Sequence, residues 1–256
     1  MIHKIQSRLT KLYYKIKESF YSDHDLQVDF DFNLERLQKN NLLIEDFEKK
    51  LNAHNIDIKD RNISWHYILF YLICQTNKYK NFLEIGTFDA KFTSHLSSYF
   101  TNNILTIDLK SDQEEFTSSY SRNIKKDFVE NRDLLLKKEN ITFQEMDSFF
   151  LLDKFYAKKS FDLIWVDGDH KNPQVTFDII SSLKLLNDTG KLLVDDILTS
   201  NSNRKYTSNE SYETLKNLKE RGIIRYDLNL KRIEKSNIHN KKYIAVVQKN
   251  NLISRD

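Results

Sequence analysis

The stretch Asn81–His95, NFLEIGTFDAKFTSH, constrains the fold more than any other part of the chain. It begins with an apolar run typical of a buried strand, turns at Gly86, and continues with a helical pattern. The whole chain has only 4 glycines, so we expect Gly86 to hold a backbone position that a side chain would obstruct. A strand that turns tightly into a helix N-terminus lets the backbone approach a nucleotide-like ligand. The stretch therefore predicts a ligand-binding turn.

From Asn81 onward, strand patterns alternate with helical patterns, which predicts a parallel sheet with helices on both faces. Two final apolar runs predict an antiparallel hairpin at one sheet edge. The expected fold class is α/β: a doubly wound, mostly parallel seven-stranded sheet with a terminal antiparallel hairpin, preceded by N-terminal helices. The expected strands are Asn81–Ile85, Asn103–Asp108, Ile141–Glu145, Phe161–Val166, Lys191–Val194, Ile223–Asn229 and Lys242–Gln248. The expected helices of this part are Lys91–Tyr99, Gln113–Lys138, Gln174–Leu186 and Ser211–Arg221.

The N-terminal helix predicted over Met1–Phe20 has apolar residues at helical spacing beside a basic stripe. It would pack on its own domain or on a sister subunit in a homo-oligomer, or attach to an anionic membrane surface. Residues 21–33 are interpreted as a connector. Two further helices are expected at Asn33–His54 and Trp65–Thr76, with Ser64 capping the second.

The predicted organisation is a helical extension at 1–60, a ligand-binding domain at 61–250 and a tail at 251–256. With 40 basic and 37 acidic residues and a net charge of +3, the chain has no global signature of nucleic-acid binding. Its single cysteine, Cys74, lies in an apolar run, which favours a reducing cytoplasm. No stretch approaches the roughly 20 apolar residues of a membrane span, and no signal-peptide pattern opens the chain.

Acidic residues follow the strands at nearly every carboxyl end. Ligands of open α/β sheets bind in the crevice beyond those ends. One such acid commonly starts a loop or caps a helix, but a series at successive strands predicts a carboxylate-lined site. The series is Glu84, Asp108, Asp147, Asp167 and the pair Asp195–Asp196.

Asp108 lies about twenty residues past Gly86, where a doubly wound fold places the carboxylate that binds ribose hydroxyls. This spacing suits NAD and S-adenosylmethionine alike. A dinucleotide site needs GxGxxG to hold a pyrophosphate, whereas this turn reads EIGTFDA, with one glycine and a nearby acid. An acid there would repel a pyrophosphate and suits a ligand with an amino group and a sulfonium.

With LEIGTF, ILTIDL, FDLIWVDGDH and GKLLVDDI in this order, the chain resembles the class I S-adenosylmethionine-dependent methyltransferases, which have a Rossmann-like fold. It is most similar to the catechol O-methyltransferase-like group and to related bacterial sugar and macrolide O-methyltransferases, over about Ser64 to Gln248. The chain departs from the pattern at Ala90, where a second glycine is usual; a methyl group fits there if the residue keeps helical φ. The resemblance implies cofactor contacts from Glu84, Gly86, Thr87 and Phe88 to the methionine part, Asp108 to the ribose, and Asp147 and Ser148 beside the adenine.

A second constellation is formed by Asp167, Asp195 and Asp196, which should converge because their strands are neighbours. Carboxylates so close together need protonation or a cation, and oxygen ligands suit Mg²⁺, Ca²⁺ or Mn²⁺. In the metal-dependent enzymes that the chain resembles, two aspartates and an asparagine bind the ion, and Asp196 stands at the asparagine position. The alternative is that Asp167 contacts the cofactor or substrate while the aspartate pair begins a loop.

His170 occupies the position of a catalytic lysine in catechol-type enzymes, and histidine is the commonest general base. Lys171 is the second candidate base, and the alternative for His170 is a surface position. The predicted function is a metal-assisted O-methyltransferase: the ion lowers the pKa of an acceptor hydroxyl and His170 removes its proton.

The polar loop Thr199–Asn209 favours a sugar acceptor, nucleotide-linked or part of a surface-glycan precursor, over a catechol-like or other small metabolite. Two rivals belong to other classes. An NAD-dependent oxidoreductase lacks support without GxGxxG, and a non-catalytic subunit of this fold would be expected to have lost Glu84, Gly86 or Asp108.

Overall fold

The computed structural model describes residues 12, 13, 16, 22–60, 63–75, 79–111, 126–155, 160–199, 208–233 and 241–250. The predicted helix Met1–Phe20, the loop Thr199–Asn209 and the tail 251–256 lie wholly or largely outside the described residues, as does the first half of the predicted helix Gln113–Lys138. Among the helices that are described, none combines the length and apolar character that crossing a membrane requires.

Seven strands form one sheet in the order β3-β2-β1-β4-β5-β7-β6. Strands β1 to β5 run parallel, and β7 is antiparallel to both β5 and β6. The strand order reverses between β1 and β4, and ligands bind at such a reversal. The strands are β1 (Asn81–Ile85), β2 (Asn103–Asp108), β3 (Ile141–Glu145), β4 (Phe161–Val166), β5 (Leu186–Ile197), β6 (Ile224–Leu230) and β7 (Tyr243–Lys249).

The predicted doubly wound sheet with a terminal antiparallel hairpin is thus confirmed. The first four strands have the predicted bounds, but β5 begins at Leu186, earlier than the predicted Lys191. The reason is that Leu186 already pairs with Phe161 before a register shift in the β4–β5 ladder.

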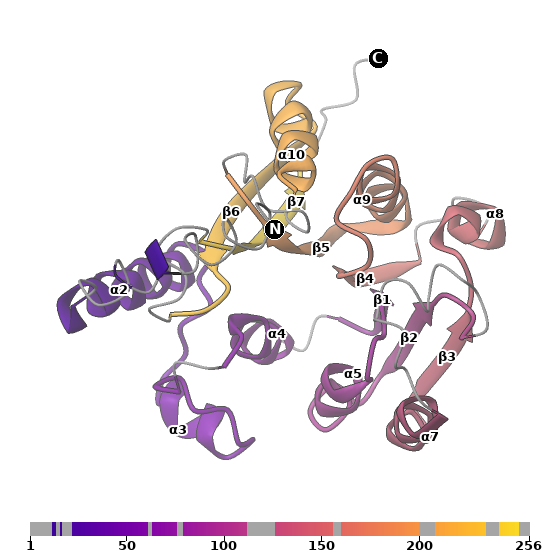
Figure 1. Ribbon diagram of the computed structural model, residues 1–256, viewed down its shortest axis with the longest axis horizontal. Coiled ribbons are helices and arrows are strands. Elements are labelled where there is room, and N and C mark those ends of the chain that lie inside the picture. The colour runs from indigo at the N-terminus through magenta and orange to yellow at the C-terminus, as the bar shows by residue number, and fades with distance from the viewer. Residues whose placement is uncertain are drawn as a thin grey trace.

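Helices cover both faces of the sheet (Figure 1). Alternate residues of each strand point to opposite faces: Trp165 of β4 joins the apolar cluster around α4, whereas Val166 joins the cluster that includes Val175 and Ile179 of α9. A short 3-10 helix, η1 (Ser148–Phe150), leads into α8. One face carries α4 (Trp65–Cys74), α5 (Lys91–Leu96) and α7 (Lys126–Leu135), and the other carries α8 (Leu151–Phe155), α9 (Gln174–Leu185) and α10 (Glu210–Glu220).

The N-terminal helices differ from the prediction. Helix α2 (Asp23–Lys39) occupies the expected connector, because Ser22 and Asp25 form a capping box that starts the helix there. The expected helix Asn33–His54 is broken after Lys39, and α3 (Phe47–Asn52) follows a turn that contains two residues of positive φ, Asn41 and Asp46.

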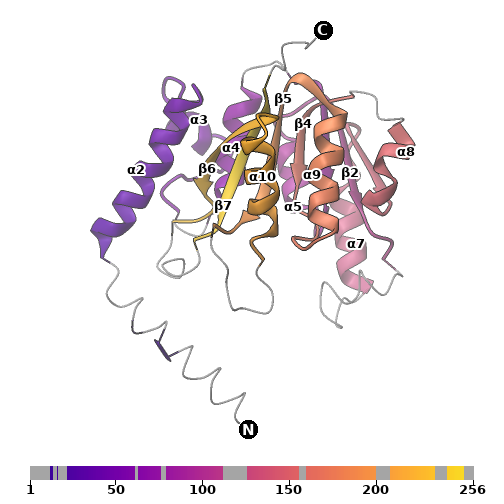
Figure 2. The ribbon, with the colours of Figure 1, turned by 90° about the horizontal axis from the view of Figure 1, so that it is seen from above.

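Helix α2 lies along β6 at the sheet edge (Figures 1 and 2). The buried side chain of Asn33 donates to the Leu230 carbonyl oxygen at 3.0 Å and accepts from the Leu230 amide at 2.6 Å. Apolar residues of the N-terminal part, among them Leu26, Leu51 and Ile56, share one cluster with α4 and the sheet. The extension is therefore packed onto the sheet, while its boundary at residue 60 stays a prediction.

Candidate active site

The turn after β1 depends on Gly86, whose φ is +97°. A Cβ at this position would lie 2.4 Å from the carbonyl oxygen of Asp167, so no side chain fits there. This confirms the expected role of the glycine. Phe88 and Ala90 also have positive φ, 49° and 59°. The expectation that Ala90 keeps a helical φ is therefore wrong: it is the left-handed N-cap of α5, where its methyl group is accommodated at a cost in backbone strain.

Asp108 lies beneath this turn and holds it in place. One carboxylate oxygen, Oδ2, accepts from the amides of Thr87 at 3.1 Å and Phe88 at 2.8 Å, and Oδ1 accepts from the amide of Leu109 at 2.8 Å. Asp108 is 7% exposed. It therefore sits at the carboxyl end of β2, as predicted, and fixes the backbone of the turn after β1.

Glu84 is placed differently from the expectation that it opens into the crevice. It is buried, and its Oε2 accepts from the hydroxyls of Thr93 and Thr106, both at 2.5 Å. Burial raises the pKa of Glu84 to about 8, although the two threonine bonds lower it. The carboxyl group therefore joins β1, β2 and α5 beneath the turn, and its contact with a cofactor stays a prediction.

The predicted adenine side contains one residue that the sequence did not reveal, Asp178. Asp147 caps η1 by accepting from the Phe149 amide at 2.9 Å. The hydroxyl of Ser148 donates to Asp178 Oδ1 at 2.7 Å, and Gln174 donates to the same oxygen at 2.9 Å. Burial raises the pKa of Asp178 to about 6. Asp178 lies on α9, and the packing of α9 against the turn after β3 brings it to Ser148. No local sequence pattern shows this contact.

Asp167, His170, Asp195 and Asp196 meet at the carboxyl ends of β4 and β5, as the sequence predicts. The ladder pairs Val166 with Val194, which places Asp167 beside Asp195. The Nε2 atom of His170 lies 3.7 Å from Asp167 Oδ1 and 3.7 Å from Asp196 Oδ2.

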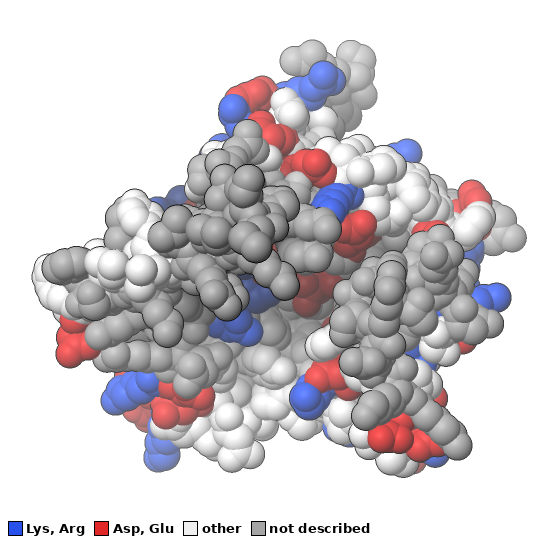
Figure 3. Space-filling view, viewed as in Figure 1, with Lys and Arg blue, Asp and Glu red and all other residues white. Residues whose placement is uncertain are grey.

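Two lysines that the sequence did not reveal complete this cluster. Lys231 Nζ donates to Asp195 Oδ2 and, at 2.7 Å, to Asp196 Oδ1, while Lys242 Nζ donates to Asp196 Oδ2. Both lysines flank the β6–β7 hairpin, where the Lys231 amide donates to the Lys242 carbonyl oxygen at 2.8 Å. Pairing the two predicted hairpin strands would have brought them together. Figure 3 shows acidic and basic side chains next to one another near the middle of the molecule.

Residues 83–197 match the family model described as a methyltransferase domain. The chain contains a methyltransferase domain. The match runs from β1 to the end of β5 and so includes the Gly86 turn, Asp108, His170 and all three aspartates of the cluster. No curated protein sequence matches the chain.

Solved structures share the fold of the methyltransferase domain. Rv0187 from MTB, solved with cofactor bound, is 14% identical, with a TM-score of 0.51 over 71% of this chain and 78% of that one. A protein assigned as an O-methyltransferase from Klebsiella pneumoniae is 14% identical, with a TM-score of 0.51 over 88% and 96%. A protein assigned as a caffeoyl-CoA O-methyltransferase from Staphylococcus aureus is 16% identical, with a TM-score of 0.50 over 87% and 100%. At these identities the likeness establishes the fold alone.

The electrostatics of the methyltransferase domain favour a neutral histidine among paired charges. Burial lowers the pKa of His170, although Asp196 and Asp195 raise it. Burial also raises the pKa of Asp167, and the adjacent charge of Asp195 adds to this rise. Burial alone would raise the pKa of Asp196, but Lys231, His170 and Lys242 lower it below its ordinary value.

The predicted metal set of Asp167, Asp195 and Asp196 does not fit the observed arrangement. The oxygens of Asp196, and one of Asp195, already accept from ammonium groups. Within the described ranges, no group of three or more His, Cys, Asp or Glu side chains could hold a metal ion. Lys171, the second candidate base, is exposed, and its backbone amide donates to Asp169 Oδ1 at 3.1 Å.

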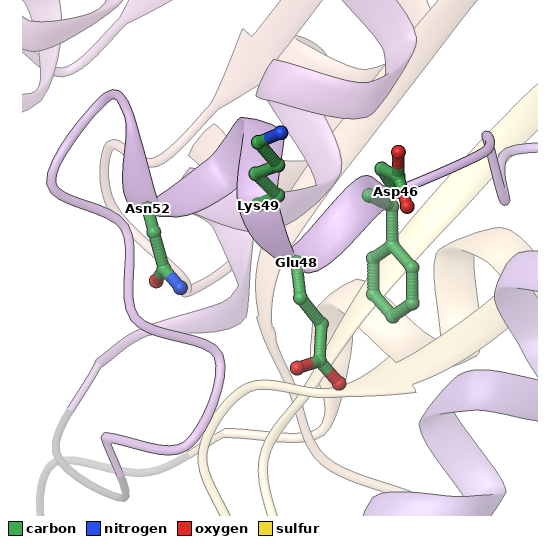
Figure 4. Close-up of a pocket in the computed structure, with 5 residues that line it drawn as sticks. Asp46, Glu48, Lys49 and Asn52 are labelled. Carbon is green, nitrogen blue, oxygen red and sulfur yellow. The ribbon is translucent and has the colours of Figure 1, made fainter.

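A surface hollow of about 530 Å³ lies far from this chemistry, on α3 (Figure 4). It is lined by Asp46, Phe47, Glu48, Lys49 and Asn52, all from one short helix and its N-cap. In Figure 4 the side chains of Glu48 and Lys49 leave the helix in different directions. Because they do not converge on one point, the hollow has no constellation suited to catalysis.

Proposed function

We propose that the chain is an S-adenosylmethionine-dependent O-methyltransferase that acts on a small polar acceptor. The observation that carries the proposal is His170, held 3.7 Å from both Asp167 and Asp196 beside the close-packed Gly86 turn. Such a histidine can remove a hydroxyl proton next to a site for a methyl donor. The similar structures, which include one with a bound cofactor and two proteins assigned as O-methyltransferases, support the same reaction class.

The donor site would be formed by the turn and by Asp108. Bound S-adenosylmethionine would supply an electrophilic methyl group. The absence of a Cβ at Gly86 lets the turn close against the Asp167 backbone. Asp108, which holds the Thr87 and Phe88 amides of the same turn, stays the proposed neighbour of the ribose. Asp147 and Ser148, at the end of β3, stay the proposed adenine neighbours, and Thr87 and Phe88 the proposed neighbours of the methionine part.

The acceptor proton would pass to His170. Because its pKa is lowered, the imidazole is neutral near pH 7 and able to accept a proton at Nε2. The imidazolium so formed would lie between the carboxyl groups of Asp167 and Asp196, and the ionised Asp196 would stabilise its charge. Fixing the acceptor in line with the methyl group would supply much of the remaining rate enhancement.

For the acceptor we propose a sugar hydroxyl first and a catechol-like metabolite second. The cluster presents Lys231, Lys242, His170 and two aspartates, a set that suits a polyhydroxylated ligand with many hydrogen-bonding groups. A divalent ion is not part of this proposal, because the lysines already hold the aspartate oxygens.

The donor is tested by calorimetric titration of the chain with S-adenosylhomocysteine and, separately, with NAD. Binding of the former alone is the expected result, and tight binding of NAD alone would overturn the proposal in favour of an oxidoreductase. The acceptor is tested by transfer of a labelled methyl group to a panel of nucleotide sugars and catechols.

The base is tested with His170→Asn, which should lower kcat by roughly 10²–10⁴-fold. The affinity for S-adenosylhomocysteine should change little. The matched control, Lys171→Met, removes an exposed side chain and should leave the rate unchanged. If both variants turned over at the full rate, His170 would not be the base.

A further inference from the structure

We propose that the ammonium group of Lys231, with Lys242, takes the place of a divalent cation among Asp167, Asp195 and Asp196, so that this site excludes metal ions. The consequence, methyl transfer without a divalent metal, rests on the proposed function.

Two lysines already occupy the aspartate oxygens that would bind an ion. Lys231 bridges the two neighbouring aspartates through Asp195 Oδ2 and Asp196 Oδ1, and Lys242 takes the second oxygen of Asp196. A magnesium ion requires oxygen ligands at about 2.0–2.1 Å in near-octahedral geometry. The same oxygens cannot bind such an ion at this distance while two ammonium groups donate to them, because the cations would repel one another.

The two lysines also compensate the negative charge of the aspartates. Converging carboxylates need compensating positive charge or a proton. Here two ammonium groups pair with two aspartates, and the third aspartate, Asp167, lies 3.7 Å from His170 Nε2. The chain thus supplies from its own side chains the positive charge that an ion would bring.

Backbone hydrogen bonds fix the position of Lys231 beside the aspartates. Its amide donates to the Lys242 carbonyl oxygen at 2.8 Å, and its own carbonyl oxygen accepts from the Trp65 amide at 2.8 Å. The Asn33 side chain forms hydrogen bonds with both the amide and the carbonyl oxygen of the preceding residue, Leu230. The Lys231 side chain is only 15% exposed. It is therefore a positioning residue built into the fold by three separate elements, unlike a mobile surface lysine.

The test is a titration of the full chain with Mn²⁺, followed by electron paramagnetic resonance of the free ion. The wild-type chain is expected to show no stoichiometric site. Lys231→Met should gain one Mn²⁺ per chain, at least about tenfold tighter than any wild-type binding, and the added change Asp195→Asn should abolish it. Lys231→Arg keeps the positive charge and should remain free of metal.

The matched control is Lys241→Met, since the Lys241 amine pairs with Asp29 at 2.5 Å and not with the cluster; it should behave as wild type. If Lys231→Met fails to fold by circular dichroism, Lys242→Met frees Asp196 Oδ2 and should also gain Mn²⁺. Stoichiometric binding by the wild type that Asp196→Asn removes would overturn the proposal. A folded lysine variant that gains no Mn²⁺ would overturn it as well.

Methyl transfer in EDTA provides a separate readout. Full activity in EDTA agrees with the proposal, and a loss that Mg²⁺ restores contradicts it. A chain with no methyl transfer under either condition would contradict the proposed function, while the Mn²⁺ titration would still decide the role of the lysines.

Discussion

The backbones of Gly86 and Asp167 lie against each other at the reversal of strand order. A Cβ on Gly86 would stand 2.4 Å from the Asp167 carbonyl oxygen and 2.7 Å from its carbonyl carbon. The Asp167 amide donates to the Ile85 carbonyl oxygen at 2.9 Å. The turn that would hold the methyl donor and the cluster that would hold the acceptor are therefore fixed to each other through backbone atoms.

Gly86→Ala should cost about 2–5 kcal/mol of unfolding free energy, the sum of left-handed strain and overpacking, and should weaken binding of S-adenosylhomocysteine. Urea unfolding measures the first effect and calorimetry the second. Gly222→Ala is the matched control, because Gly222 has φ +70° with nothing within 4 Å of the added Cβ. It should cost only about 1–2 kcal/mol. Equal costs for both would show that the close approach to Asp167 is unimportant.

Ala90→Gly should raise the free energy of unfolding by up to about 1 kcal/mol, because a residue with φ 59° gains from losing its Cβ. Loss of the buried methyl group offsets part of this gain. The control is Ala53→Gly, at φ −62°, which should destabilise by about 0.5–1 kcal/mol. Opposite signs in thermal unfolding are the expected result; destabilisation by both would contradict the assignment of strain to Ala90.

The burial of Glu84 predicts a pH-dependent stability. Burial raises its pKa from 4.5 to about 8 in the folded chain. Between these values the folded chain keeps a proton that the unfolded chain releases, so stability falls as pH rises from about 4.5 to about 8. Glu84→Gln, which cannot titrate, should flatten this slope in urea unfolding at several pH values. Glu220→Gln, on the exposed end of α10, provides the baseline. An unchanged slope in Glu84→Gln would contradict the prediction.

Asn33→Ala should lower the free energy of unfolding by about 2–3 kcal/mol, because it removes two buried hydrogen bonds to the Leu230 backbone. Chemical denaturation measures the loss. Asn52→Ala, at an exposed position of α3, should change stability by less than about 0.5 kcal/mol. A similar small effect at Asn33 would mean that water replaces the side chain without cost.

The core strands could be predicted from the sequence because each is an apolar run bounded by polar residues. The bounds of β1 and β4 are matched at both ends, and from them follows the convergence of Asp167, Asp195 and Asp196. These are local patterns, and the parallel connection of the strands converts them into positions at one edge of the sheet.

The remaining features depend on contacts between distant residues. The positive φ of Ala90 results from how α5 meets the turn, which no local pattern reports. Lys231 reaches Asp195 across 36 positions of the chain, and Ser148 reaches Asp178 across 30. The start of helix α2 was not predicted, because its acidic residues alternate with apolar residues and resemble a connector. The capping box at Ser22 was a local signal for this start. A carboxylate cluster alone suggests a metal; only the fold shows which cations are already present.

Strand β6 ends the sheet on one side among the described strands. Unpaired backbone groups on such a strand are a template on which another chain can add a strand. Helix α2 covers this edge: Asn33 bonds the Leu230 backbone, and Lys39 pairs with Asp227 at 2.6 Å. Removing the residues through Lys39 would expose the edge, and the shortened chains would self-associate by sheet extension. Helix α2 therefore occupies the edge at which another chain could otherwise add a strand.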